Sequence, residues 1–403
     1  MSNALLHPFS PPAQAESDFI NVVRAEGSTL WDDQGKSYID GIGSLWLCQV
    51  GHGRADMIEA INAQMATLTT YNTFAPFTND AAAECAELIA EKSPYDGARV
   101  FLGCSGSEAV DTVLKLARLT HQLQGDHDRQ MIVRRTHGYH GVNFGGTSAQ
   151  GIEPNRQNWG DLVPHFIEVP HDDIEVMATV FAEHGERIAA VITEPVQGAG
   201  GVLPPPDGYL ALTRRLCDDN GALLIFDEVI CGFGRTGSWF GAQTFDVRPD
   251  MMTFAKGVTS GYLPLSGVIV SPGVDEVLRT IDGPMRHGYT YSGHPTCAAA
   301  AIKNIQIIEA EGLVARAEHI GSIVQPGLAA MAKDGLIEHG RGVGAIWAAE
   351  LGRDSLPARA ALLERGVIMR PIGTSLAMCP PLVIGDEELG FMLDQMAEVL
   401  SSH

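Results

Sequence analysis

The amino-acid sequence predicts an α/β fold, with a large domain built on a mainly parallel sheet flanked by helices and a small α/β lobe formed by both chain ends. From about residue 98, short apolar runs alternate with amphipathic stretches, which is typical of a doubly wound sheet. The chain has 403 residues, enough for two domains. Hydrophobic residues make up 45% of it, so a sizeable core is available.

The strands follow from local patterns along the chain. Residues 27–31 and 36–40 flank a turn that ends at Gly35, which predicts a β-hairpin near the N-terminus. Apolar runs of strand length predict the large sheet, because strands covered on both faces are apolar throughout. These runs are 98–104, 130–135, 166–169, 188–193, 222–229, 251–255 and 266–270.

The C-terminal part of the chain predicts the rest of the small lobe. A long helical pattern follows Pro295, and strand and helix patterns then alternate at 342–351, 366–369 and 387–400. We therefore expect residues 1–47 and 296–403 to form the small domain and residues 48–295 to form the large domain.

Composition excludes several kinds of partner and site. The formal net charge of −22 argues against nucleic acid or an anionic membrane as a partner, because both would be repelled. No HExxH motif or Cys/His cluster is present, so no metal site is expected. Seven cysteines without a CxxC pair fit reduced thiols, and the N-terminus does not read as a secretory signal. We therefore expect a cytoplasmic protein.

Two apolar strands each end in a single ionisable residue, Asp227 in the first and Lys256 in the second. Strand ends of α/β sheets are where such proteins hold ligands. A desolvated lysine can become a nucleophilic amine, and a nearby carboxylate can hold a protonated aromatic nitrogen. Pyridoxal phosphate (PLP) enzymes use this pair of residues. Taken alone, an ion pair between Asp227 and Lys256 at the sheet edge explains the pattern equally well.

The segment 104–118 predicts a phosphate cradle, because it follows a strand and opens a helix. Ser105 and Glu108 have the spacing of a capping box. The N–H groups of this helix start, at Ser105, Gly106 and Ser107, can bind a phosphate, and Gly106 lets the anion approach the backbone. An ordinary capped helix is the alternative.

A second glycine motif, Gly232-Phe-Gly-Arg-Thr-Gly237, matches the GxGxxG pattern of dinucleotide sites and follows a strand. The next residues, 238–243, lack the amphipathic helix that a pyrophosphate requires. A shaped loop is therefore favoured over a dinucleotide site.

With these motifs in this order, residues 31–393 resemble class III (ω-type) aminotransferases of the fold-type I PLP superfamily. The resemblance implies PLP as the cofactor, Lys256 as the Schiff-base lysine, Asp227 at the pyridine nitrogen and Val229 against the ring. The matching segments are Thr136-His-Gly-Tyr-His-Gly141, Ile192-Thr-Glu-Pro-Val-Gln-Gly198, 226–237, Phe254-Ala-Lys-Gly257 and Gly288-Tyr-Thr-Tyr-Ser-Gly-His-Pro295.

The resemblance also implies roles for residues around this pair. Tyr139 and His140 would lie at the cofactor ring, and Glu194 would act as a catalytic residue that supports the site. Thr290 would reach the phosphate of the neighbouring subunit in a homodimer, with a tetramer left open. Each residue has a plainer alternative: loop packing for Tyr139 and more so for His140, a solvated carboxylate for Glu194, and a local backbone contact for Thr290.

Substrate-binding residues are implied in the same way. Leu45, Trp46 and Phe74 fall in segments similar to substrate-pocket regions, although a core anchor explains Trp46 equally well. Relatives that act on ornithine or γ-aminobutyrate often have Glu where Ala199 stands, so that design is disfavoured. Arg370 resembles the mobile arginine that clamps the carboxylate of pyruvate or alanine, with a surface ion pair as the alternative. Thr374 departs from the Gly-Asp that relatives have there.

We therefore expect a PLP-dependent aminotransferase (transaminase) that moves an amino group from an amine or ω-amino acid to a keto acid, with pyruvate favoured. The expected mechanism is a ping-pong Schiff-base cycle in which Lys256 shuttles the proton. Another PLP reaction, by an aminomutase, racemase or decarboxylase, is the alternative within the superfamily. A non-catalytic binding protein is the alternative outside it.

Overall fold

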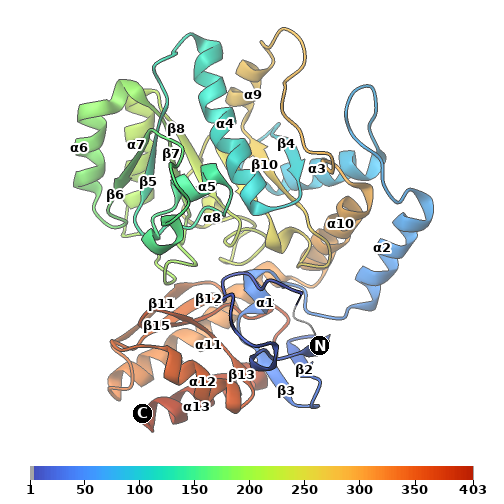
Figure 1. The fold of residues 1–403 in the computed structure, drawn as a ribbon, viewed down its shortest axis with the longest axis vertical. Helices are drawn as coiled ribbons and strands as arrows, with labels where there is room; N and C mark the ends of the chain where they lie inside the picture. The colour runs from blue at the N-terminus through green and yellow to red at the C-terminus, as the bar shows by residue number, and fades with distance from the viewer. Residues whose placement is uncertain (1–3, 403) are drawn as a thin grey trace.

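The computed structural model describes residues 4–402, and a seven-stranded sheet forms the centre of its upper part (Figure 1). The strand order is β4-β10-β9-β8-β7-β5-β6, and only β10 runs antiparallel to its neighbours. The mainly parallel sheet is therefore confirmed, and each predicted strand forms. The bounds are β4 Arg99–Gly103, β5 Met131–Arg135, β6 Phe166–Val169, β7 Ile188–Thr193, β8 Leu223–Asp227, β9 Met251–Phe254 and β10 Ser266–Val270.

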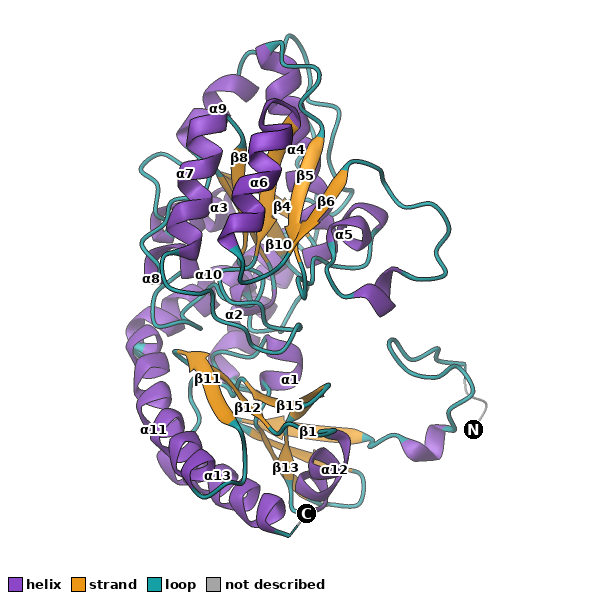
Figure 2. Ribbon diagram, turned by 90° about the vertical axis from the view of Figure 1, so that its left-hand side faces the viewer, coloured by secondary structure: helices purple, strands orange, loops and turns teal. Residues whose placement is uncertain are grey.

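Helices cover both faces of this sheet (Figure 2). Side chains alternate between the faces along β8: Leu224 and Phe226 pack in the core cluster that includes α7, whereas Ile225 packs in the cluster that includes α4. Burial on both faces explains the continuous apolar runs in the sequence. The helices of this part are α2 Ala55–Thr67, α3 Asp80–Lys92, α4 Gly106–Gln124, α5 Phe144–Ala149, α6 Ile174–His184, α7 Tyr209–Asn220, α8 Gly241–Thr244, α9 Pro272–Leu278 and α10 Pro295–Ala310.

Two small sheets form the lower part, where both ends of the chain lie (Figure 1). The first has the order β1-β2-β3-β13, so β13 of the C-terminal segment pairs in parallel with β3 of the predicted N-terminal hairpin. The second has the order β11-β12-β15-β14. The bounds are β1 Val22–Glu26, β2 Thr29–Asp32, β3 Ser37–Asp40, β11 His339–Val343, β12 Ile346–Glu350, β13 Val367–Ile368, β14 Arg370–Ile372 and β15 Ser375–Met378.

The sequence did not predict strand β1. Its residues are mostly exposed at the edge of the small sheet, so they carry no alternation of buried and exposed side chains. The remaining helices are α1 Gly43–Trp46, α11 Leu313–Lys333, α12 Leu356–Glu364 and α13 Asp386–Ser401, with short 3₁₀ turns at Glu16–Asp18, Glu153–Arg156, Gly185–Arg187 and Lys256–Val258. Within residues 4–402, no helix has the length and apolar character needed to cross a membrane.

The sheet topology sets the place of the site. Strands β5, β7, β8 and β9 are parallel neighbours, so the loops that follow them open at the same edge of the sheet. Asp227 ends β8, Lys256 follows β9, and Glu194 follows β7. That edge faces the lower part of the molecule (Figure 1). The residues that the sequence singled out from distant segments therefore converge there.

Candidate active site

A pocket lies at this edge of the sheet. Eight of the predicted site residues line it together. Its lining residues are Gly106, Ser107, Val110, Tyr139, His140, Gly141, Glu194, Asp227, Val229, Ile230, Ala255 and Lys256.

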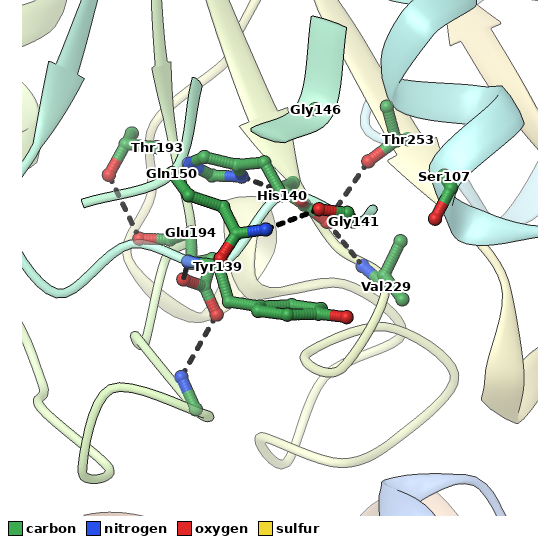
Figure 3. Close-up of polar contacts among 12 residues, drawn as sticks. Ser107, Tyr139, His140, Gly141, Gly146, Gln150, Thr193, Glu194, Val229 and Thr253 are labelled. Carbon is green, nitrogen blue, oxygen red and sulfur yellow. Dashed lines mark hydrogen bonds and ion pairs between the residues drawn. The ribbon is translucent and has the colours of Figure 1, made fainter. Parts of the chain in front are cut away.

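The carboxylate of Asp227 is buried and held by three contacts, whose partners His140, Val229 and Thr253 are labelled in Figure 3. Nδ1 of His140 lies 2.8 Å from Oδ2 of Asp227, and the hydroxyl of Thr253 donates to Oδ1 at 3.1 Å. The backbone N–H of Val229 also donates to Oδ1, at 3.2 Å. These contacts fix the orientation of the carboxylate at the strand end, since each satisfies one of its lone pairs.

Lys256 reaches the same pocket from the turn after β9. Burial lowers the pKa of its ammonium group, while the carboxylates of Asp227 and Glu194 raise it in part. The positive charge of Arg370 adds to the lowering of the Lys256 pKa. A lysine with a lowered pKa more readily presents a neutral, nucleophilic amine.

Glu194 lines the pocket, and both of its carboxylate oxygens accept backbone hydrogen bonds (Figure 3). Oε1 accepts from the N–H of Tyr139 and Oε2 from the N–H of Gly198, each at 2.9 Å. Burial raises the pKa of Glu194 to about 7. The geometry therefore favours a positioning role, in which Glu194 fixes the loop that carries Tyr139.

The helix start predicted as a phosphate cradle has the expected capping box. The hydroxyl of Ser105 accepts from the N–H of Glu108 at 3.2 Å, and the Glu108 carboxylate accepts from the N–H of Ser105 at 3.3 Å. Gly106 and Ser107 line the pocket, whereas the Ser105 side chain serves as the cap. The positive end of α4 therefore opens into the pocket.

Gly141 adjoins this cradle, and the sequence did not single it out. Its φ is +87°, and a Cβ there would lie 2.6 Å from Oγ of Ser107, so only glycine fits this approach. The same hydroxyl accepts the N–H of Val142 at 3.0 Å. The signal in the sequence that could have indicated this close approach was the glycine directly after Tyr139 and His140.

Thr253 is a further residue that sequence reasoning missed. It is the register partner of Asp227 on the neighbouring parallel strand, which brings its hydroxyl to the carboxylate. A polar residue in an otherwise apolar strand, three residues before Lys256, was the signal.

The predicted substrate residues lie outside the pocket lining of the single chain. Trp46 is only 2% exposed and packs in a core cluster with Val196 and Ile230, as expected for a core anchor. Leu45 is exposed. Ala199 is partly buried in the turn after Gln197.

Phe74 and Thr290 are exposed on two segments that contact each other. A Cβ on Gly288 would lie 3.1 Å from the Phe74 ring, and the hydroxyl of Thr73 donates to the carbonyl oxygen of Ser292 at 2.9 Å. Thr290 thus lies on an outward-facing loop beside the exposed Phe74 ring.

The GxGxxG segment forms turns rather than a helix start. Gly234 and Gly237 have φ values of +90° and +92°, and the next helix is the four-residue α8. The loop instead carries Arg235, which is fully buried and donates to the carbonyl oxygen of Pro380 at 2.6 Å. Residues 232–237 therefore form a loop, as favoured from the sequence, and not the start of a dinucleotide-binding helix.

A family model described as Aminotransferase class-III matches residues 12–400. The chain belongs to this family. It is similar to the putrescine–pyruvate aminotransferase of Pseudomonas aeruginosa, with 34% identity over 95% of this chain and 91% of that protein. It is likewise 34% identical to the diaminobutyrate–2-oxoglutarate transaminase of Halomonas elongata, over 91% of this chain and 87% of that protein.

A solved structure of a transaminase from the marine bacterium Virgibacillus shares the fold of this aminotransferase. Its TM-score is 0.95 at 37% identity, covering 99% of this chain and 97% of that one. The fold class and the resemblance inferred from the sequence are therefore confirmed.

Class III aminotransferases depend on PLP, and the pocket of this chain fits that cofactor. The N-terminus of α4 offers N–H donors for a phosphate. Gly106 has no side chain to cover this backbone, and a Cβ added there would lie 3.3 Å from the Val229 side chain. A buried carboxylate at Asp227 suits a cationic ring nitrogen, and Lys256 supplies an amine with a lowered pKa. The aromatic ring of Tyr139 adds a flat wall.

Proposed function

We propose that this pocket is the active site, and that Lys256 binds PLP covalently while Asp227 faces its ring nitrogen. The observation that carries the proposal is the convergence of Lys256, Asp227 and the N-terminus of α4 on one pocket. In the same proposal, the N–H groups of Gly106 and Ser107 hold the phosphate, and Tyr139 and Val229 contact the ring.

Each proposed residue has a defined chemical task. When bound, PLP supplies the electron sink that lets the α-proton of an amine leave. Nζ of Lys256 accepts that proton and returns it, a kind of general acid–base catalysis typically worth roughly 10²- to 10⁴-fold. Asp227, held by His140 and Thr253, presents its carboxylate to the ring nitrogen. Glu194 holds the Tyr139 loop in place.

We propose that the amino donor is an amine or ω-amino acid and that pyruvate is the acceptor. Arg370 supports this, because its charge acts on both Tyr139 and Lys256 and can pair with a carboxylate bidentately. Ala199 supports it too. Relatives that act on ornithine or γ-aminobutyrate often have Glu at this position, and Ala199 has no carboxylate that could pair with a substrate-binding arginine as that Glu does. The two similar proteins are named for different acceptors, pyruvate and 2-oxoglutarate, so the acceptor requires a direct test.

We also propose a homodimer in which Thr290 reaches the cofactor of the neighbouring subunit. Thr290 is exposed on a loop beside the exposed ring of Phe74, as a residue that meets a second subunit would be. The seven cysteines are all free thiols, which supports a reducing cytoplasm as the compartment.

The test compares wild type with Lys256→Ala. Wild type is expected to show the absorbance of Lys-bound PLP, parallel initial-rate lines typical of ping-pong kinetics, and alanine formed in proportion to amine consumed. Lys256→Ala should lose all three. A Lys256→Ala protein that kept transaminating would overturn the proposal. Racemised amine or evolved CO₂ instead of alanine would favour the racemase or decarboxylase alternative, and strong glutamate formation from 2-oxoglutarate would displace pyruvate.

A further inference from the structure

The turn that carries Lys256 has an unfavourable backbone conformation. Lys256 has a φ of +46° and Ser260 a φ of +49°, both in the left-handed region that residues with a Cβ rarely adopt. Two of the turn's own backbone hydrogen bonds are long, with 3.3 Å from the N–H of Thr259 and 3.4 Å from that of Ser260. Such a conformation persists only where surrounding contacts determine it.

Asn304, on helix α10, supplies such contacts to the turn that carries Lys256. Its side-chain amide donates to the carbonyl oxygens of Gly257 at 2.8 Å and Val258 at 3.0 Å. Its Oδ1 accepts from the hydroxyl of Ser260 at 2.6 Å. Asn304 is fully buried, so both of its N–H groups and its oxygen are used within the protein.

The same network extends to the N-terminal part of the chain. Oγ of Ser260 accepts from the N–H groups of Gln49 and Val50, each at 3.2 Å. The side chain of Gln49 lies against Gly257, where a Cβ would come within 2.0 Å of Nε2. The turn is therefore held by one side chain from α10 and one segment from residues 49–50.

We propose that Asn304 is a positioning residue for Lys256. Its carboxamide holds residues 256–260 in the conformation that directs the Lys256 amine into the pocket. This inference rests on the proposed role of Lys256. Neither aspartate nor glutamine reproduces these contacts: aspartate has no N–H to donate and would place carboxylate lone pairs against two carbonyl oxygens, and glutamine is one methylene longer. A merely structural residue would affect stability alone.

The test uses Asn304→Asp, which keeps the size of the side chain and removes both donors. We expect kcat to fall roughly ten- to a hundredfold, because a reacting group displaced by about 1 Å can lose that much rate. The KM for the amine should change little. A structural role would not move two further readouts that we expect to change: the pH dependence of the Lys-bound cofactor absorbance, and the rate at which cofactor-free protein captures PLP.

Asn220→Asp is the matched control. Asn220 also donates its amide to a backbone carbonyl, that of Leu216 at 2.9 Å, but at the end of α7. It should lose stability without a change in kcat, in the absorbance profile or in the rate of PLP capture. Ser260→Ala is the second variant, in case Asn304→Asp folds poorly, and should shift the same readouts in the same direction.

Parallel measurement of Lys256→Ala separates the two proposals. If Lys256→Ala keeps the bound-cofactor absorbance, the proposed role of Lys256 is wrong and this inference falls with it. If Lys256→Ala loses that absorbance while Asn304→Asp and Ser260→Ala match wild type in kcat, pH profile and PLP capture, the positioning role of Asn304 alone is wrong.

Discussion

Nδ1 of His140 lies 2.8 Å from Oδ2 of Asp227, and both side chains are almost completely buried. The pair joins the loop after β5 to the end of β8, two segments 87 residues apart in sequence. His140 thus has a specific partner in Asp227, whereas the sequence placed it at the cofactor ring with loop packing as the plainer alternative. Because the imidazole contacts one oxygen while Thr253 and Val229 donate to the other, the carboxylate has little freedom to rotate.

We predict that His140→Ala weakens cofactor binding and slows transamination. A hydrogen bond to a charged group is worth about 1.5–3 kcal/mol, so the PLP dissociation constant should rise roughly ten- to a hundredfold. Absorbance titration of cofactor-free protein measures it. His121→Ala is the control, because His121 is equally buried but its ring contacts the Ala189 carbonyl oxygen near the far end of α4. A dissociation constant within about twofold of wild type would contradict the prediction.

The Glu194 carboxyl makes stability depend on pH. Burial raises its pKa from 4.5 to about 7, so the folded state binds this proton more tightly than the unfolded state. The stabilisation from that proton is present below the unfolded pKa and is lost as pH rises to about 7, a change of about 3 kcal/mol for a shift of this size. We predict that the free energy of unfolding of Glu194→Gln falls less steeply over this pH range. Urea unfolding at a series of pH values from the unfolded pKa to about 7 measures it.

Glu228→Gln is the matched comparison for that prediction. Burial also raises the pKa of Glu228 to about 7, but its oxygens accept from the N–H groups of Gly241 and Ala242 at the start of α8. Both variants should flatten the pH dependence of stability. Only Glu194→Gln should also lower kcat, because only Glu194 holds the loop of Tyr139. Equal kcat for the two variants would argue against the positioning role of Glu194.

Arg370→Ala should raise the KM for pyruvate roughly ten- to a hundredfold, since it removes a charge-assisted contact with the carboxylate. The KM for an uncharged amine should change much less, because that donor has no carboxylate. Steady-state kinetics with each substrate varied in turn measures both. Arg365→Ala is the control: Arg365 pairs with Glu398 at the surface, where ion pairs contribute little. A pyruvate KM unchanged in Arg370→Ala would remove the proposed carboxylate clamp.

Thr290→Ala should weaken PLP binding only if a second subunit receives this side chain. We expect wild type to be a dimer by light scattering, with a PLP dissociation constant that rises in Thr290→Ala by roughly tenfold for one lost bond to a phosphate. Thr280→Ala is the control, because the Thr280 hydroxyl contacts only the local carbonyl oxygen of Val277. A monomeric wild type with full PLP affinity would refute the shared site.

The sequence by itself determined the features that depend on neighbours along the chain. The apolar runs gave every strand of the large sheet, the Ser105–Glu108 spacing gave the capping box of α4, and the strand-end positions of Asp227 and Lys256 placed both at one edge. These follow from local periodicity and from the rule that parallel strands end at the same edge of a sheet. The motif order was also enough to identify the family.

Only the tertiary structure decided which side chains contact one another across distant segments. It placed Trp46 in a core rather than in the pocket lining, paired His140 with Asp227, and brought Asn304 to the turn of Lys256. These contacts depend on strand register, on helix packing and on the left-handed turns at Lys256 and Ser260. A single side-chain hydrogen bond leaves no periodic trace in the sequence, because it depends on the distance between two atoms rather than on a pattern of residue types.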